Sequence, residues 1–296
     1  MKKYLFILVV ALTATAIASN AAPGIKSIDG SKYSISVGDV EMIVNAGEGG
    51  KILSYTLNGK EVIETRHISP FSYGGTFWSS PQKEWNWPPV PEYDRMPYSI
   101  EEKENSLLLT SNVSPRYQYR FSKEFSIDSE DNAIVITYRI KNEADVDKNV
   151  APWEISRVQG DGVMFFEAGE EDITPAGILP FTFEHGMAWF VYNTAPENRK
   201  INADGTGWQA YANNGLLFIH RYEDLDKSQP APDESELQIY VNMGHTFIEL
   251  EGQGKYETLK PGESLEWTVR WYLVENPYEA VPSQELADLA KKVLNK

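Results

Sequence analysis

Residues 264–274, with the sequence SLEWTVRWYLV, are the clearest periodic segment of the chain. Every second residue from Leu265 to Leu273 is large and apolar, and charged residues such as Glu266 and Arg270 stand between them. This period of two predicts a β-strand with one buried face.

Short apolar segments of the same kind follow one another along most of the chain, separated by turn residues such as Asn58-Gly59 and Pro261-Gly262. We expect strands at residues 33–37, 40–44, 51–57, 119–127, 133–141, 188–192, 216–221, 236–241 and 246–250. One helix is expected after Ser283, which can cap it. Because strands dominate without βαβ alternation, the sequence predicts an all-β sandwich.

Two segments, residues 71–98 and 160–180, interrupt this rhythm and are expected to be long loops. Ordered loops on a rigid sheet scaffold are common places for a binding site.

The first 21 residues have the features of an export signal. Lys2 and Lys3 precede the apolar residues 4–12, and small residues lead to Ser19-Asn20-Ala21. The apolar run is short for a membrane span, although a retained anchor is the alternative. We therefore expect residues 1–21 to be removed and residues 22–296 to form a single domain in the periplasm or outside the cell.

The chain contains 27 basic and 43 acidic residues, a net charge of -16, and no cysteine. The negative charge disfavours nucleic acids, anionic membranes and polyanionic substrates, so a neutral ligand fits better. The alternative is that the charge serves only solubility. Without cysteine, a disulfide framework is excluded.

The strongest local motif is FWSSPQKEWNWPP at residues 77–89, with three tryptophans within ten residues. Trp78, Trp85 and Trp87 offer flat apolar rings against which a sugar can stack, and polar residues such as Gln82 can bind its hydroxyl groups. The alternative is that these tryptophans close one end of the sandwich.

A second motif is VAPWEISR at residues 150–157. In an extended strand Trp153 and Arg157 share one face and Glu154 lies on the other. The first pair could bind a sugar and Glu154 could act as an acid or base. An Arg–Glu pair that stabilises a strand edge is the alternative.

A third motif, FIELEGQG at residues 247–254, places Glu249 and Glu251 on one face of a strand. Two carboxylates held close repel each other, which raises one pKa and suits acid–base catalysis. The alternative is a solvated strand face.

The four histidines are His67, His185, His220 and His245, and none has a second ligand at the spacing of a metal site. We therefore expect no metal site. His185 is the one candidate for a catalytic role.

Taken in order, several segments resemble galactose mutarotase-like (aldose 1-epimerase-like) proteins. NAGEGGKI at residues 45–52 and LNGKEV at residues 57–62 resemble their opening strands and hairpin. Glu251 and Gln253, followed by LKPGE at residues 259–263, resemble their C-terminal region. The segments PQKEWNWPP (81–89) and APWE (151–154) are most similar to exported proteins of the DUF4380 domain family.

The resemblance implies a galactose-mutarotase-type β-supersandwich with one C-terminal helix and no cofactor. It assigns Glu251 as the base that takes the anomeric hydroxyl proton, with Glu154 or His185 as the acid that protonates the ring oxygen. The expected sugar-binding residues are Trp78, Gln82, Trp85, Trp87, Trp153, Arg157 and Glu249.

The sequence also departs from the mutarotase pattern. Mutarotases carry a catalytic histidine in mid-chain, where this chain has Pro152-Trp153-Glu154, and Arg66 and His67 match their early substrate-binding residues only loosely. Three functions stay open: an aldose 1-epimerase, a non-catalytic binding protein for a neutral sugar or oligosaccharide, and a glycan lyase or hydrolase.

Overall fold

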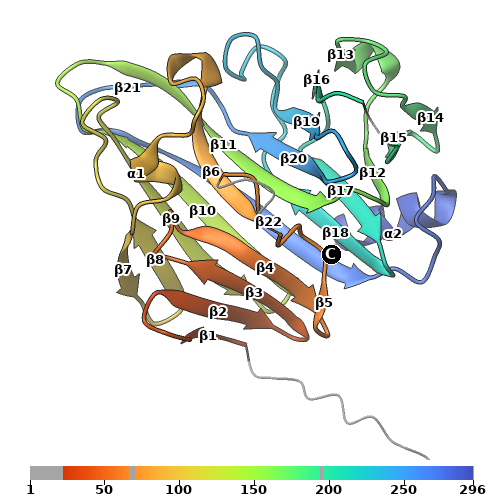
Figure 1. Cartoon of the computed structure of the whole chain (residues 1–296), viewed down its shortest axis with the longest axis horizontal. Coiled ribbons are helices and arrows are strands. Elements are labelled where there is room, and N and C mark those ends of the chain that lie inside the picture. Colours follow the sequence, from red (N-terminus) through yellow and green to blue (C-terminus); the bar gives the residue numbers. More distant parts are fainter. Residues whose placement is uncertain (1–22, 67–70, 194–195, 296) are drawn as a thin grey trace, which may run out of the picture.

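The computed structural model describes residues 23–66, 71–193 and 196–295. The expected export signal at residues 1–21 and His67 lie outside the described residues. The described chain is almost entirely β-structure, arranged as two large antiparallel sheets (Figure 1).

One sheet has twelve strands and the other has ten. The twelve-stranded sheet contains β1 (Gly24–Ser27), β2 (Lys32–Val37), β3 (Val40–Asn45), β4 (Lys51–Leu57), β5 (Lys60–Glu61), β6 (Gly75–Ser80), β11 (Lys148–Gln159), β13 (Ile173–Thr174), β16 (Arg199–Ala203), β19 (Leu237–Val241), β20 (Phe247–Gln253) and β21 (Glu257–Leu259). The ten-stranded sheet contains β7 (Ser99–Glu102), β8 (Ser106–Thr110), β9 (Tyr119–Asp128), β10 (Ala133–Asn142), β12 (Val163–Phe166), β14 (Thr182–Glu184), β15 (Met187–Val191), β17 (Trp208–Asn213), β18 (Leu216–Arg221) and β22 (Ser264–Glu275).

The strand order shows which strands lie near the middle of each sheet. The main path of the first sheet is β1-β2-β3-β4-β6-β11-β20-β19-β16-β13, and that of the second is β14-β15-β12-β17-β18-β22-β10-β9-β8-β7. The long strands β11 and β22 therefore lie near the middle of their sheets, and the predicted strand at residues 264–274 is confirmed as β22.

The segment 71–98 is not wholly a loop as expected, because it contains β6. All six residues of β6 are buried, so its sequence shows no alternation of apolar and polar residues. The segment 160–180 likewise contains β12, whose four residues are all buried. The remainder of the two segments holds the short strand β13, the one-turn helix α1 (Pro91–Asp94) and two 3-10 turns (Gln82–Glu84 and Glu170–Asp172).

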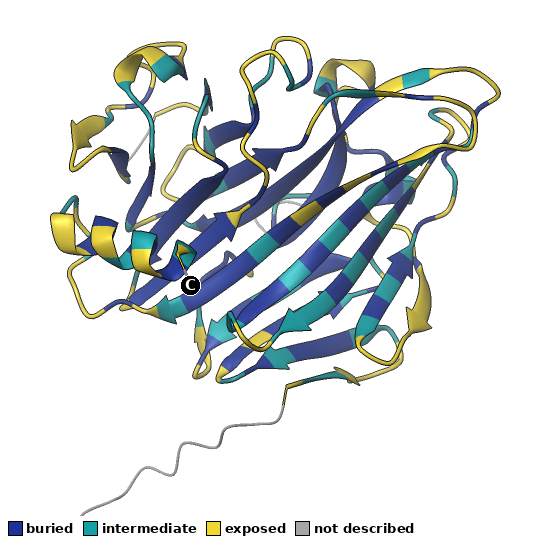
Figure 2. Cartoon of the chain, turned by 180° about the vertical axis from the view of Figure 1, so that it is seen from behind, coloured by how far each residue is buried: buried dark blue, intermediate teal, exposed yellow. Residues whose placement is uncertain are grey.

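The predicted C-terminal helix is confirmed as α2 (Gln284–Leu294), with the Ser283 hydroxyl accepting a hydrogen bond from the Leu286 amide at 3.3 Å. The buried side of α2 packs on the ten-stranded sheet, where Ala290 belongs to the same apolar cluster as Trp208. Its other side is exposed, so the helix covers the outer face of this sheet (Figure 2).

The space between the sheets is filled by apolar and aromatic side chains, with Phe77 stacked on Tyr138 at a ring-centroid distance of 4.2 Å. Glu154 is buried in this layer and accepts hydrogen bonds from the Tyr138 hydroxyl (3.0 Å) and the Trp271 indole (2.8 Å). Burial raises the pKa of Glu154 from 4.5 to about 8, although both hydrogen bonds oppose this shift. The carboxyl group is therefore mostly protonated at neutral pH.

No helix among the described residues is both long and apolar enough to cross a membrane.

Glu154 should make the stability of the protein depend on pH. The pKa of Glu154 is about 8 in the folded state and near 4.5 in the unfolded state. Between these two pH values the folded protein keeps the proton, whereas the unfolded protein has lost it. The stabilisation from the proton is complete below the unfolded value and is lost as the pH rises through the folded value. The free energy of unfolding, measured with urea, should therefore fall less in Glu154→Gln than in the unmodified protein when the pH is raised from about 5 to about 8. An equal loss in both proteins would contradict this assignment.

Candidate functional site

The outer face of the twelve-stranded sheet carries most of the predicted site residues. β11 pairs with β6 on one side and with β20 on the other, and directly opposed residues share a face. The register places Trp153 opposite Trp78, and Arg157 opposite Glu249. Glu251 is two residues from Glu249 on β20 and points to the same face. The predicted grouping of these residues by strand alternation agrees with the structure.

Trp78, Trp85, Trp87 and Trp153 form one tryptophan cluster on this face. Trp78 lies at its centre and makes edge-to-face contacts with Trp85 at 5.6 Å, with Trp153 at 5.6 Å and with Trp87 at 6.1 Å. Such contacts are the preferred geometry of neighbouring aromatic rings. The cluster therefore joins two strands to the segment that follows β6.

The four rings differ sharply in exposure. Trp78, Trp85 and Trp153 are 4%, 8% and 2% exposed, whereas Trp87 is 52% exposed. The prediction that all four form walls of a sugar site stays a prediction, but the structure gives their rings very different access to solvent. Three of them are buried, and Trp87 alone among the four is about half exposed to solvent.

Each of the three buried indole N–H groups of the tryptophan cluster has a hydrogen-bond acceptor. Trp85 donates to the Ser79 carbonyl at 2.8 Å, Trp78 to Asp94 Oδ1 at 3.0 Å and Trp153 to Glu251 Oε2 at 3.0 Å. A buried polar group without a partner would be costly, so these bonds hold the three rings in single orientations.

Beside the tryptophans lies a charged cluster of Arg157, Lys200, Glu249 and Glu251. Lys200 Nζ is 2.8 Å from Glu251 Oε2, and Arg157 Nη2 is 2.8 Å from Glu249 Oε1. Each cation also lies against an indole ring, Lys200 at 4.6 Å from Trp153 and Arg157 at 5.6 Å from Trp78. The two carboxylates of β20 are thus each neutralised by a separate cation.

Glu251 has a pKa suited to a catalytic base, but its side chain is completely buried. Burial raises the pKa of Glu251 to about 7 and the negative charge of Glu249 adds to the shift, while the ammonium of Lys200 opposes it. Glu251 Oε1 has no hydrogen-bond partner among the described residues. A pKa near neutrality suits proton transfer, but the side chain is 0% exposed.

Lys200 was not found from the sequence. It stands on β16, 51 residues before Glu251, in a segment without any motif. Only the strand order β20-β19-β16 brings the two residues to one face.

Trp78 is positioned by a buried ion pair that the sequence also did not reveal. Lys51 Nζ lies 3.0 Å from Asp94 Oδ2 and donates to the Asp94 carbonyl at 2.8 Å, and both side chains are almost completely buried. Asp94, the last residue of α1, in turn accepts the Trp78 indole N–H. A buried charge left without its partner is strongly unfavourable, so this pair fixes α1 and Trp78 together.

Gln82 lies beside the cluster in the 3-10 turn that follows β6. Its backbone amide donates to Glu234 Oε1 at 2.8 Å, and Glu234 Oε2 accepts from Gln253 Nε2 at 2.8 Å. The turn that carries Gln82 is thereby tied to the end of β20. The role of the Gln82 side chain in binding hydroxyl groups stays a prediction.

Two predicted acids are not brought to this face. Glu154 points into the layer between the sheets because it follows Trp153 in the strand, so it cannot act on a sugar beside Glu251. His185 lies in the turn between β14 and β15, at the end of the ten-stranded sheet, whereas Glu251 is central in the other sheet. Neither residue is placed to serve as the second acid.

Within the described ranges, no group of three or more His, Asp or Glu side chains is arranged to hold a metal ion.

No protein-family model and no curated protein matches the sequence. Solved structures do match. A galactose mutarotase-like protein from Lactobacillus casei is 10% identical, with a TM-score of 0.59 over 81% of this chain and 100% of that one. The chain has the galactose mutarotase-like fold.

Two further structures have the same fold. A galactose mutarotase-like protein from Clostridium acetobutylicum is 12% identical over 86% of this chain and 99% of that one, with a TM-score of 0.55. A candidate aldose 1-epimerase from Klebsiella pneumoniae is 11% identical over 89% of this chain and 83% of that one, with a TM-score of 0.60. At these identities the likeness concerns the fold. The closer relation to the DUF4380 proteins stays a prediction.

The different exposure of Trp85 and Trp87 should appear in their mutants. Trp85→Ala removes a buried ring and should lower the free energy of unfolding by about 3–5 kcal/mol. Trp87→Ala removes a ring that is 52% exposed and should cost less than about 1 kcal/mol. Urea unfolding of both variants checks the difference, and equal losses would show that Trp87 is structural as well.

Proposed function

We propose that the protein is an exported carbohydrate-binding protein that holds a neutral sugar against Trp87 on the galactose mutarotase-like scaffold. The observation that carries this proposal is the half-exposed ring of Trp87, held at 6.1 Å from the buried Trp78. Sugar rings have apolar faces that stack on such a ring, and a preformed position lowers the entropy lost on binding. The export part rests on the sequence of residues 1–21.

Electrostatics supports a neutral ligand. The chain has a net charge of -16, which repels anionic polymers at long range. The two basic side chains of the charged cluster are already paired with Glu249 and Glu251. They are therefore poorly suited to attract a carboxylate or sulfate group.

The environment of Glu251 favours binding over catalysis. A mutarotase needs a base at the anomeric hydroxyl group and an acid at the ring oxygen, both in contact with the sugar. Glu251 is 0% exposed, and one of its oxygens is occupied by Trp153 and Lys200. A sugar could reach this carboxylate only after these side chains had moved.

Mutarotation is the second candidate function, because Glu251 has a pKa of about 7 and one oxygen without a hydrogen-bond partner among the described residues. In that case Lys200 would be the nearest proton donor, at 2.8 Å from the carboxylate. The fold, which is that of galactose mutarotase-like proteins, is consistent with this activity.

Binding can be tested by a thermal-shift screen of the mature protein against neutral monosaccharides and oligosaccharides, with uronates as a comparison. A ligand of the folded state raises the unfolding midpoint once its concentration exceeds the dissociation constant. We expect a shift with a neutral sugar, lost in Trp87→Ala. Tyr278→Ala is the matched control, because Tyr278 is an exposed aromatic residue (44%) on the connection between β22 and α2. The absence of any shift at high sugar concentration, or an unchanged shift in Trp87→Ala, would contradict the proposal.

Catalysis can be tested separately by polarimetry of freshly dissolved sugar. If the protein only binds sugar, the rate of anomeric interconversion should equal the uncatalysed rate. An acceleration that Glu251→Gln abolishes would instead establish the mutarotase function, because the amide cannot accept the proton.

A further inference from the structure

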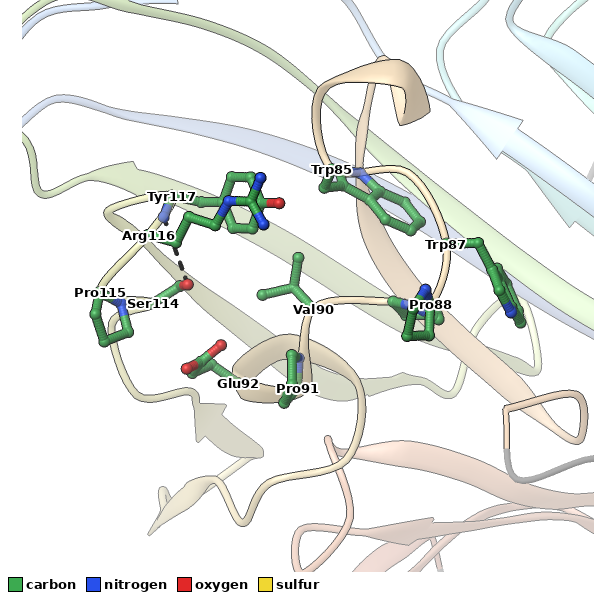
Figure 3. A pocket seen from close by; sticks show the side chains of 11 residues that line it. Trp85, Trp87, Pro88, Val90, Pro91, Glu92, Ser114, Pro115, Arg116 and Tyr117 are labelled. Carbon is green, nitrogen blue, oxygen red and sulfur yellow. Dashed lines mark hydrogen bonds between the residues drawn. The ribbon is translucent and has the colours of Figure 1, made fainter.

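A cavity of about 410 Å³ is lined in part by Trp87. It lies between the segment 85–92, which follows β6, and the turn at residues 114–117 between β8 and β9 (Figure 3). Its volume falls within the range of sites for small ligands. No function discussed so far accounts for it.

The two walls of the cavity differ in chemistry. Trp85, Trp87 and the prolines that follow them form an apolar wall, and Arg116 and Tyr117 face it across the cavity (Figure 3). Glu92 lines the lower end of the same space. A sugar ring needs both kinds of surface, because its faces are apolar and its edges carry hydroxyl groups.

Arg116 is available to bind such hydroxyl groups. Its guanidinium group lies 5.1 Å from the ring of Tyr117, and the residue is exposed to solvent. Its donors and the carboxylate acceptor of Glu92 offer complementary partners for the hydroxyl groups of one neutral ring.

Hydrogen bonds between Tyr93 and Tyr119 join the two segments that form the walls. The Tyr93 hydroxyl, on α1, donates to the Tyr119 carbonyl at 3.0 Å and accepts from the Tyr119 amide at 3.2 Å. Tyr119 begins β9, directly after the turn at residues 114–117. The cavity therefore lies between two segments that are already fixed to each other. Little conformational entropy of these segments should be lost when a ligand binds.

Trp87 belongs both to the tryptophan cluster and to this cavity. If one ring of an oligosaccharide stacks on Trp87, the adjoining sugar rings of that oligosaccharide would lie at the mouth of the cavity. Resting on the function proposed above, we propose that the cavity is a second subsite and that the ligand is a neutral oligosaccharide whose successive rings contact Trp87 and the pair Arg116 and Glu92. A monosaccharide would use only part of this surface.

The proposal is tested by calorimetric titration with glucose, galactose, mannose and xylose and with the β-1,4-linked di-, tri- and tetrasaccharides of each. In the series that binds, the dissociation constant should fall at least about tenfold from the monosaccharide to the tetrasaccharide. Arg116→Ala and Glu92→Ala should each reduce this gain to less than about threefold. Arg120→Ala is the matched control, because Arg120 is an exposed neighbour on β9 that pairs with Glu143 and does not line the cavity. Unfolding midpoints of all variants establish that they are folded.

The outcomes separate the two proposals. A monosaccharide and its tetrasaccharide that bind equally well would overturn the second subsite but not sugar binding itself. A chain-length gain that survives both Arg116→Ala and Glu92→Ala would overturn the placement of the subsite in this cavity. If none of these sugars binds, sugar binding fails and the second subsite fails with it.

Discussion

The side chains of β11 alternate between two environments, and the candidate site depends on this alternation. Because β11 lies between β6 and β20, Trp153 and Arg157 reach the outer face while Glu154 points between the sheets. The outward residues meet carboxylates of β20, and the inward one meets Tyr138 and Trp271. One strand thus anchors the tryptophan cluster and contributes a buried acid to the layer between the sheets.

The hydrogen bond from Trp153 to Glu251 shows how this chain differs from the mutarotase pattern that its sequence resembles. That pattern places a catalytic histidine where this chain has Pro152-Trp153-Glu154. Here the indole of Trp153 occupies an oxygen of the carboxylate expected to be the base, and Lys200 occupies the same oxygen. The face is consequently well packed and charge-balanced around Glu251, and within the tryptophan cluster the exposed ring is that of Trp87.

Much of the fold could be predicted from the sequence because strand alternation is a local property. The period of two identified β22, placed Trp153 and Arg157 on one face, and paired Glu249 with Glu251. It failed for β6, since a strand buried on both faces has no alternation to read.

The candidate site was less predictable, because exposure and pairing depend on segments far apart in the chain. Trp85 and Trp87 are two residues apart in one motif, yet one is 8% and the other 52% exposed. Lys200 reaches Glu251 only through the order of the strands, and Asp94 reaches Trp78 only through the fold of α1. None of these relations has a sequence signature.

A crystal structure of the protein with the sugar that most raises its unfolding midpoint would test the central claim most directly. We expect a sugar ring stacked on Trp87, with the Trp153 indole still donating to Glu251 and Lys200 still paired with Glu251. A sugar hydroxyl group bound directly to the Glu251 carboxylate, with Trp153 or Lys200 displaced, would contradict binding at Trp87 alone and favour catalysis at Glu251.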